Sequence, residues 1–264
     1  MTADSISDPT EDAAAAQDAA AAINAASAPP VLGWEITAVI CLAVLPDAIN
    51  AAGQFFGAYA GSPMSFAYMT ASLISRSLQA SLPVMIIVYY RSGSLRELGL
   101  GDRPRTRDAL IAVALFVSGT IAMYAAIYPL YYATWFLLGE AGLAWWNTPA
   151  GSEFPGITSG IDVLILLPLL SAANGFAEEL VMRGYLIPRV EAITHSSIAA
   201  VLITSFAFAS YHLYQGLGGV VGTAALGIVY GAVFCWTRRL WPLALAHALA
   251  DFFLYLWAAM GWTT

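Results

Sequence analysis

Five ionisable side chains of the kinds that catalyse hydrolysis lie inside apolar stretches of this sequence. Glu178 and Glu179 are adjacent in NGFAEELVMRGYL, His212 follows in FAFASYHLYQ, and His247 and Asp251 share LALAHALAD. An ionisable side chain at the centre of a bilayer costs about 2.5–3.5 kcal/mol on insertion scales, and such residues commonly mark functional sites. Each of the five is therefore a candidate functional residue.

Helical spacing separates the roles of the two glutamates. Glu179 and Arg183 are four residues apart, which places them on one helix face where they can form an ion pair. Glu178 is rotated by about 100° from Glu179 and can point elsewhere. A carboxylate that faces a cavity is what a general base requires, so Glu178 is the candidate base. The alternative is that both glutamates only hold Arg183.

The histidines also have partners at helical spacing. Phe208 and His212 are four residues apart, so an aromatic ring stacks one turn from the imidazole. His247 and Asp251 have the same spacing, which can present two ligands to one metal or let a carboxylate orient an imidazole. The structural alternatives are a packed histidine and an intrahelical polar pair. Because polar groups in lipid must find one another, three such helices predict one hydrolytic cluster.

Composition identifies the elements that would position these residues. The chain has 264 residues, of which 59% are hydrophobic and 10% charged, and its mean hydropathy is +0.71. Runs of about 20 apolar residues recur, each long enough to cross a bilayer, and continuous runs favour helices. We predict an all-α, polytopic membrane bundle of about seven transmembrane helices, at roughly 35–58, 66–90, 108–138, 161–187, 197–214, 218–237 and 241–261.

The chain divides into two predicted parts. Residues 1–30 carry five acidic and no basic residues, which predicts a disordered, Ala-rich acidic tail. Residues 31–264 form the predicted transmembrane domain, with residues 160–252 as its core. The third run is long for one crossing and contains Pro129, which predicts either a kink or a continuation along the interface, and Trp145 with Trp146 predicts an interfacial anchor.

Arginine placement predicts the orientation. All ten basic residues are arginine, and the connection 91–107 holds five of them, whereas residues 108–182 hold none. Positive charge favours the cytoplasmic side, so this connection and the N-terminus are expected inside. Asp47 and Arg76 are expected to pair with each other as a structural link.

The combined motifs resemble a known family. They are EExxxR (Glu178, Glu179, Arg183), FxxxH (Phe208, His212) and HxxxN/D (His247, Asp251), on successive apolar helices. Together they resemble the CPBP family of intramembrane proteases, which comprises CAAX prenyl proteases and bacteriocin-processing proteins and is also called the Abi family. The resemblance implies a helical endopeptidase whose cavity opens toward the cytoplasm.

The resemblance also implies roles for residues. Glu178 and His212 would activate water, Glu179 and Arg183 would hold the fourth span, and His247 with Asp251 would face the scissile carbonyl. Glu178, His212, His247 and Asp251 would be the ligands if Zn²⁺ is bound, because imidazoles and carboxylates suit zinc. A metal-free glutamate mechanism is the alternative. Asp251 stands where Asn would be the natural donor, which counts against that alternative when Asp251 is ionised.

The expected partners are the lipid bilayer and a membrane-anchored or prenylated peptide substrate, with no nucleic acid. The expected location is the bacterial inner membrane. Two other functions stay open: a proton- or ion-coupled transporter, because such clusters also relay protons, and a non-catalytic protein of the bacteriocin-immunity type.

Overall fold

The computed structural model describes residues 33–56, 65–101, 103–146 and 159–259. In these ranges the regular elements are all helices, which confirms the all-α prediction. The predicted tail, residues 1–30, lies outside the described residues.

The helices follow the apolar runs of the sequence. In chain order they are α2 (Gly33–Val39), η1 (Ile40–Val44), α3 (Leu45–Phe55), α4 (Phe66–Ser92), η2 (Arg96–Leu98), α5 (Thr106–Leu143), η4 (Asp162–Leu166), α6 (Leu167–Glu179), η5 (Leu180–Leu186), α7 (Ile187–Thr194), α8 (Ser197–Ser210), η6 (Leu213–Gln215), α9 (Gly216–Thr237) and α10 (Trp241–Ala259). The segments η1, η4 and η5 are π-helical turns within longer helices. The element that carries both glutamates therefore runs without a break from Asp162 to Thr194.

Among the described residues, six helices are long and apolar enough to cross a membrane. The remaining predicted span, 197–214, is the fifth in chain order, and it is different. Its helix α8 ends at Ser210 after 14 residues, a length of about 21 Å at 1.5 Å per residue. That is less than the ~30 Å of hydrocarbon. His212 therefore lies just beyond a short helix rather than inside a full crossing.

Helix α5 has an outward face and a break at Gly139. Leu110, Val113, Val117 and Ile121 recur at helical spacing and are all exposed, as expected for a lipid-facing stripe. Pro129 lies inside the helix, whereas the non-helical residue is Gly139, with φ 61° and ψ −157°. Glycine adopts this positive φ without steric cost.

Trp145 and Trp146 differ in burial. Trp145 is 53% exposed, but Trp146 is 4% exposed. The carbonyl of Trp145 accepts a hydrogen bond from Leu217 N at 2.8 Å, so this segment docks on the start of α9. Trp146 is therefore a buried packing residue, whereas Trp145 stays a predicted interfacial anchor.

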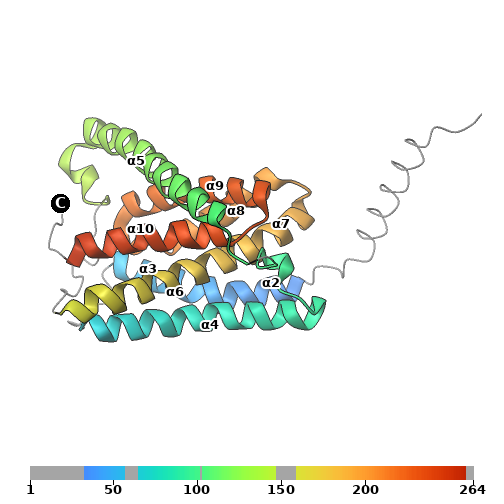
Figure 1. The fold of residues 1–264 in the computed structure, drawn as a ribbon. Helices are drawn as coiled ribbons and strands as arrows, with labels where there is room; N and C mark the ends of the chain where they lie inside the picture. The colour runs from blue at the N-terminus through green and yellow to red at the C-terminus, as the bar shows by residue number, and fades with distance from the viewer. Residues whose placement is uncertain (1–32, 57–64, 102, 147–158, 260–264) are drawn as a thin grey trace, which may run out of the picture. The chain divides into compact units, whose positions relative to one another are not determined.

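Ion pairs tie the helices together at one end of the bundle, on the right of Figure 1. Arg189 Nη2 lies 3.1 Å from Glu97, Arg238 Nη2 lies 2.7 Å from Glu191, and Arg239 Nη2 lies 2.6 Å from Asp108. Arg91 pairs with Glu35 at the same end. We call this the arginine end. It holds eight of the ten arginines: 91, 96, 103, 105, 107, 189, 238 and 239.

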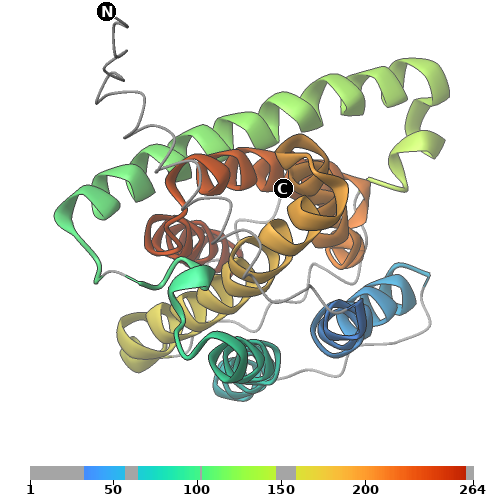
Figure 2. The same ribbon diagram turned by 90° about the vertical axis from the view of Figure 1, so that its right-hand side faces the viewer.

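The helix with the two glutamates runs through the middle of the bundle. Viewed from the arginine end, α5 crosses one side while α4 and the α2–α3 helix lie on the other (Figure 2). Leu180, Tyr185 and Ile187 are fully buried in the main hydrophobic core. Both α4 and α10 pack against α6, and this places the glutamates beside the helix that carries His247.

Candidate active site

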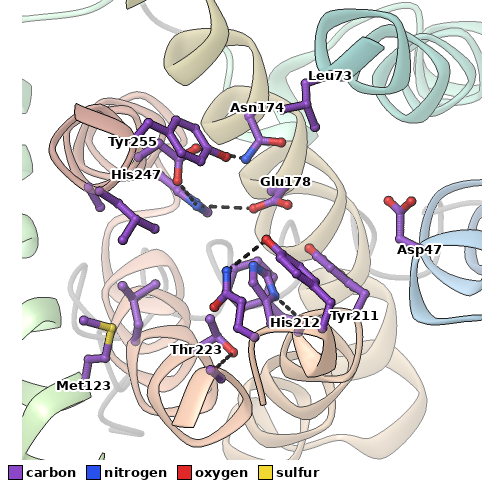
Figure 3. A pocket seen from close by; sticks show the side chains of 18 of the residues that line it. Asp47, Leu73, Met123, Asn174, Glu178, Tyr211, His212, Thr223, His247 and Tyr255 are labelled. Carbon is purple, nitrogen blue, oxygen red and sulfur yellow. Dashed lines mark hydrogen bonds and ion pairs between the residues drawn. The ribbon is translucent and has the colours of Figure 1, made fainter. Parts of the chain in front are cut away.

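A cavity of about 1340 Å³ lies among α3, α4, α5, α6, α9 and α10. Its wall includes all four predicted catalytic residues, Glu178, His212, His247 and Asp251, and the supporting Phe208. Figure 3 shows Glu178 and His247 directed toward each other across this space, with His212 below them. The structure therefore brings chemistry from three separate segments to one cavity.

The His247 ring lies among three carboxylates. Its Nδ1 is 2.7 Å from Glu179 Oε1, and its Nε2 is 3.2 Å from Glu178 Oε2. The same Nε2 is 3.7 Å from Asp251 Oδ1 on the next turn of α10. Because a carboxylate only accepts, Nδ1–H donates to Glu179, and this hydrogen bond fixes the orientation of the ring. His247 therefore connects the two adjacent glutamates.

Glu179 is anchored from its other side by Arg183. Arg183 Nη1 donates to Glu179 Oε1 at 2.9 Å, and the exposed fractions of the two residues are 1% and 0%. The guanidinium also lies over the Phe208 ring at 4.6 Å, a cation–π contact. The i, i+4 ion pair predicted from the sequence is confirmed. The contact of Glu179 with His247 is an addition that the sequence did not predict.

Gly175 allows α6 and α10 to approach at this level. A Cβ atom at residue 175 would lie 2.8 Å from Ala248 N and 3.1 Å from His247 Cβ. Only a residue without a side chain fits this contact. Gly175 therefore sets the distance at which His247 meets the glutamates.

His212 faces the same cavity through a different arrangement. Its Nδ1 is 3.0 Å from the Phe208 carbonyl, which can only accept, so Nδ1 carries the proton. In the neutral ring this leaves Nε2 as an acceptor. Phe208 packs against both imidazoles, with centroid distances of 4.8 Å to His212 and 5.8 Å to His247. Within the described residues, Glu178 has a direct contact with His247 and none with His212.

Asn174 is a site residue that the sequence reasoning missed. Its Nδ2 donates to Asp251 Oδ2 at 2.9 Å, and it lines the cavity. Asn174 is four residues before Glu178, so both lie on one face of α6. That spacing in an apolar helix was the available signal. The amide that seemed to be missing at residue 251 is thus present on the neighbouring helix.

Asp47 and Arg76 pair as expected, linking α3 to α4. Their side chains are 34% and 44% exposed, and both line the cavity. The pair is therefore partly exposed at the cavity wall rather than fully buried.

The arrangement does not fit a metal ion. Among the described residues, no group of three His, Cys, Asp or Glu side chains could hold one. His247 Nδ1 is hydrogen-bonded to Glu179, and Glu178 and Asp251 lie beside its Nε2 at 3.2 and 3.7 Å. The four residues predicted as ligands therefore share a cavity without forming a coordination sphere.

Comparison with known proteins agrees with the motifs. Residues 160–253 match the family model described as type II CAAX prenyl endopeptidase Rce1-like. No curated protein and no solved structure matches the chain. The matched segment contains Glu178, His212, His247 and Asp251. This chain is therefore an integral membrane protein whose residues 160–253 are similar to the Rce1-like CAAX endopeptidases, a family of proteases.

Proposed function

We propose that this protein is a glutamate-dependent intramembrane endopeptidase that cleaves a membrane-associated peptide. The observation that carries the proposal is the contact of 3.2 Å between Glu178 Oε2 and His247 Nε2 at the cavity wall. It holds Oε2 against His247, away from solvent, and leaves the rest of the carboxylate at the cavity wall. The side chain of Glu178 is 18% exposed, while that of Glu179 is fully buried, so Glu178 is the one that can meet a substrate.

The water has two acceptors available to it. Glu178 takes one proton of the water, and Nε2 of His212 accepts a hydrogen bond from the other. The hydroxyl oxygen adds to the scissile carbonyl carbon and gives a tetrahedral oxyanion. Glu178 then passes its proton to the leaving nitrogen, and the C–N bond breaks to give an acid and an amine. One carboxyl serves as base and then as acid.

The oxyanion needs donors, and Asp251 supplies none when it is ionised. Asn174 has two amide hydrogens, of which one is bonded to Asp251 Oδ2. We assign the second hydrogen to the oxyanion, together with a proton on His247 Nε2. A donor held in place before the reaction stabilises the developing charge, commonly by about 2.7–4 kcal/mol. The Asn174–Asp251 pair thus removes the objection that Asp251 raised against a metal-free reaction.

No step of this scheme passes through a metal. The support is that, within the described residues, no group of three His, Cys, Asp or Glu side chains is placed to hold a metal ion. Glu179 and Arg183 are positioning residues in this scheme, because they act on the reacting groups only through His247.

The purified protein in detergent tests the proposal against a panel of fluorogenic membrane-anchored peptides, prenylated and unprenylated. We expect cleavage by the wild type and a loss of about 10²–10⁴-fold in Glu178→Gln, the usual range for a general acid–base residue. Glu140→Gln is the matched control, since Glu140 is an exposed glutamate near the end of α5. Its activity should equal that of the wild type.

Three results would contradict the proposal. If Glu178→Gln turned over at the wild-type rate, Glu178 would not be the general base. If a chelator abolished activity and added zinc restored it, a zinc-dependent reaction would replace the metal-free scheme. Proton-driven flux in proteoliposomes without cleavage of any peptide would favour a transporter.

A further inference from the structure

A second hollow lies on the outer surface of the bundle, where α5, α6 and α10 meet. It has a volume of about 310 Å³, and we call it the α5–α10 groove. Its lining includes Val113 of α5 and Leu245 of α10, which are 54% and 41% exposed, so the groove opens outward. No described residue lines both this groove and the active-site cavity. The groove is therefore a separate feature of the molecule.

The groove lies at the level of the membrane hydrocarbon. Helix α10 packs against both α5 and α6 and forms the floor, and its Leu245, Leu249 and Phe252 recur on one face at i, i+4 and i+7. These positions span about 10 Å at 1.5 Å per residue. The polar lining residue Ser171 donates its hydroxyl to Leu167 O at 2.9 Å, within its own helix. Among the described residues, the lining therefore offers a ligand only apolar surface.

One end of the groove begins a single turn after an exposed arginine. Arg105 is the N-cap of α5, and the lining residues Ala109 and Ala112 follow it at i+4 and i+7, on the same side of the helix. Arg107 is also exposed, but it lies about 200° around the helix from Ala109. A long arginine side chain can lie along apolar surface and place its charge at the membrane surface. Arg105 is therefore the arginine on the groove side of α5.

The surroundings of Arg105 carry an excess of positive charge. Four of the eight arginines at the arginine end pair with the four acids described there, which are Glu35, Glu97, Asp108 and Glu191. The other four, at positions 96, 103, 105 and 107, are exposed. Asp102, which lies outside the described residues, is a fifth acid in the sequence here. Eight arginines against five acids leave an excess of three positive charges.

We infer that the α5–α10 groove binds an anionic glycerophospholipid, with an acyl chain in the groove and the headgroup at Arg105. The two parts of the site select this ligand together. An apolar groove in the hydrocarbon layer accepts a hydrocarbon chain, and a basic cluster where a transmembrane helix leaves the membrane attracts anionic headgroups. Free phosphate would leave the groove empty, and an uncharged lipid would leave the positive charge unmatched. The inference goes beyond the proposed peptidase function and does not depend on it.

A lipid bound here would contact the helix pair that forms the active site. Ala248 lines the groove, and its backbone nitrogen would lie 2.8 Å from a Cβ atom at Gly175. An acyl chain in the groove therefore packs beside the close contact of α6 with α10. Because a ligand that binds the folded state stabilises it, binding should raise the melting temperature.

Two lipids with the same chains test the site on the purified full chain in detergent. Dioleoyl phosphatidylglycerol is anionic, and dioleoyl phosphatidylcholine has no net charge. Native mass spectrometry over a lipid concentration series counts the lipid retained, and thermal unfolding provides a second measurement. Glycerol 3-phosphate, which has no acyl chain, is the third probe.

Two pairs of variants separate the headgroup from the chain. Arg105→Gln is matched by Arg107→Gln, which removes the same charge from the opposite face of α5. Val113→Trp fills the groove, and Val117→Trp is its control, because Val117 is exposed on α5 but does not line the groove. The melting temperature without lipid shows whether each variant is folded.

We expect the wild type to retain phosphatidylglycerol more tightly than phosphatidylcholine and to melt at a higher temperature with it. Arg105→Gln should lower the affinity for phosphatidylglycerol about fivefold, the usual effect of one arginine at a membrane surface, and Arg107→Gln by less than that. Val113→Trp should lower retention of both lipids, and Val117→Trp should not. Glycerol 3-phosphate should leave the melting temperature unchanged.

Four results would overturn the inference. Equal retention of the two lipids would remove the role of charge, and equal losses in Arg105→Gln and Arg107→Gln would indicate diffuse attraction to the arginine end. Unchanged retention in a folded Val113→Trp protein would exclude the groove. Equal stabilisation by glycerol 3-phosphate and phosphatidylglycerol would assign the site to free phosphate. Peptide cleavage is not measured, so failure of the proposed peptidase is a separate result.

Discussion

His247 and Glu179, on helices far apart in the sequence, share a hydrogen bond of 2.7 Å between Nδ1 and Oε1. The same oxygen of Glu179 accepts from Arg183 at 2.9 Å. The ion pair on one helix therefore fixes the imidazole on another, and the imidazole in turn meets Glu178. This chain of contacts gives the two adjacent glutamates separate roles in the proposed reaction, in which Glu178 reacts and Glu179 holds its partner His247.

We predict that Glu179→Ala lowers kcat by about 10–100-fold with little change in KM. A hydrogen bond to a charged group contributes about 1.5–3 kcal/mol, and about 1.4 kcal/mol is a tenfold change in rate. Glu179→Gln keeps an oxygen that can accept from His247 Nδ1–H and should recover part of the loss. Steady-state kinetics of the three proteins on one peptide measures this.

A purely structural role for Glu179 would give a different pattern. The melting temperature would then fall in parallel with kcat in both variants, and Glu179→Gln would give no recovery. Equal kcat in Glu179→Ala and the wild type would remove Glu179 from the site altogether.

Exchange of Asn174 and Asp251 tests the amide that faces the cavity. Asn174→Asp alone places two carboxylates together and should lower both the melting temperature and kcat. Adding Asp251→Asn restores one amide and one carboxylate across the same contact, so the double variant should recover the melting temperature. Because the amide then comes from α10, recovery of kcat measures whether the position of the donor matters.

Additive effects of Asn174→Asp and Asp251→Asn on the melting temperature would contradict the pairing of these two residues. If the two substitutions lower the melting temperature independently, the hydrogen bond of 2.9 Å between these residues does not stabilise the protein.

The Asp47–Arg76 ion pair gives a prediction about stability. Since both side chains are a third or more exposed, their coupling energy should be about 0.2–1 kcal/mol, as for exposed pairs. A double-mutant cycle of Asp47→Asn and Arg76→Gln, followed by thermal unfolding in detergent, measures it. A structural link predicts an unchanged kcat in the double variant, and a large fall in kcat would assign the pair to substrate binding.

The sequence predicted what depends on one helix at a time. Apolar runs gave the long helices because lipid leaves no other way to satisfy the backbone. The i, i+4 spacing gave the ion pair of Glu179 with Arg183. Contacts between helices could not be predicted from the sequence, because residue spacing within one helix does not fix its rotation against another helix. The bonds of His247 with Glu179 and of Asn174 with Asp251 are of this kind.

The end of α8 was missed for a related reason. The run 197–214 is apolar enough by composition to be a crossing, but the helix stops at Ser210 and a turn follows. The turn places Nδ1 of His212 on the carbonyl of Phe208 and puts the ring in the cavity wall. The apolar content of a segment indicates its environment. The length of the helix within that segment depends on where the chain turns, and here the turn presents His212 to the cavity.

Gly175→Ala tests whether the close approach of α6 and α10 sets the geometry of the site. The added methyl group would meet the backbone of Ala248 and Cβ of His247, so α10 must shift. Overpacking of this kind costs about 1–3 kcal/mol, and a shift of about 1 Å at the reacting groups can lower the rate about 100-fold. Gly160→Ala is the control, because nothing lies within 4 Å of a Cβ there. We expect Gly175→Ala to lower kcat by about 100-fold while the protein still unfolds cooperatively with a modest fall in melting temperature. We expect neither quantity to change in Gly160→Ala. Unchanged kcat in Gly175→Ala would mean that His247 reaches Glu178 without the glycine contact, and its position would then depend on Glu179 alone.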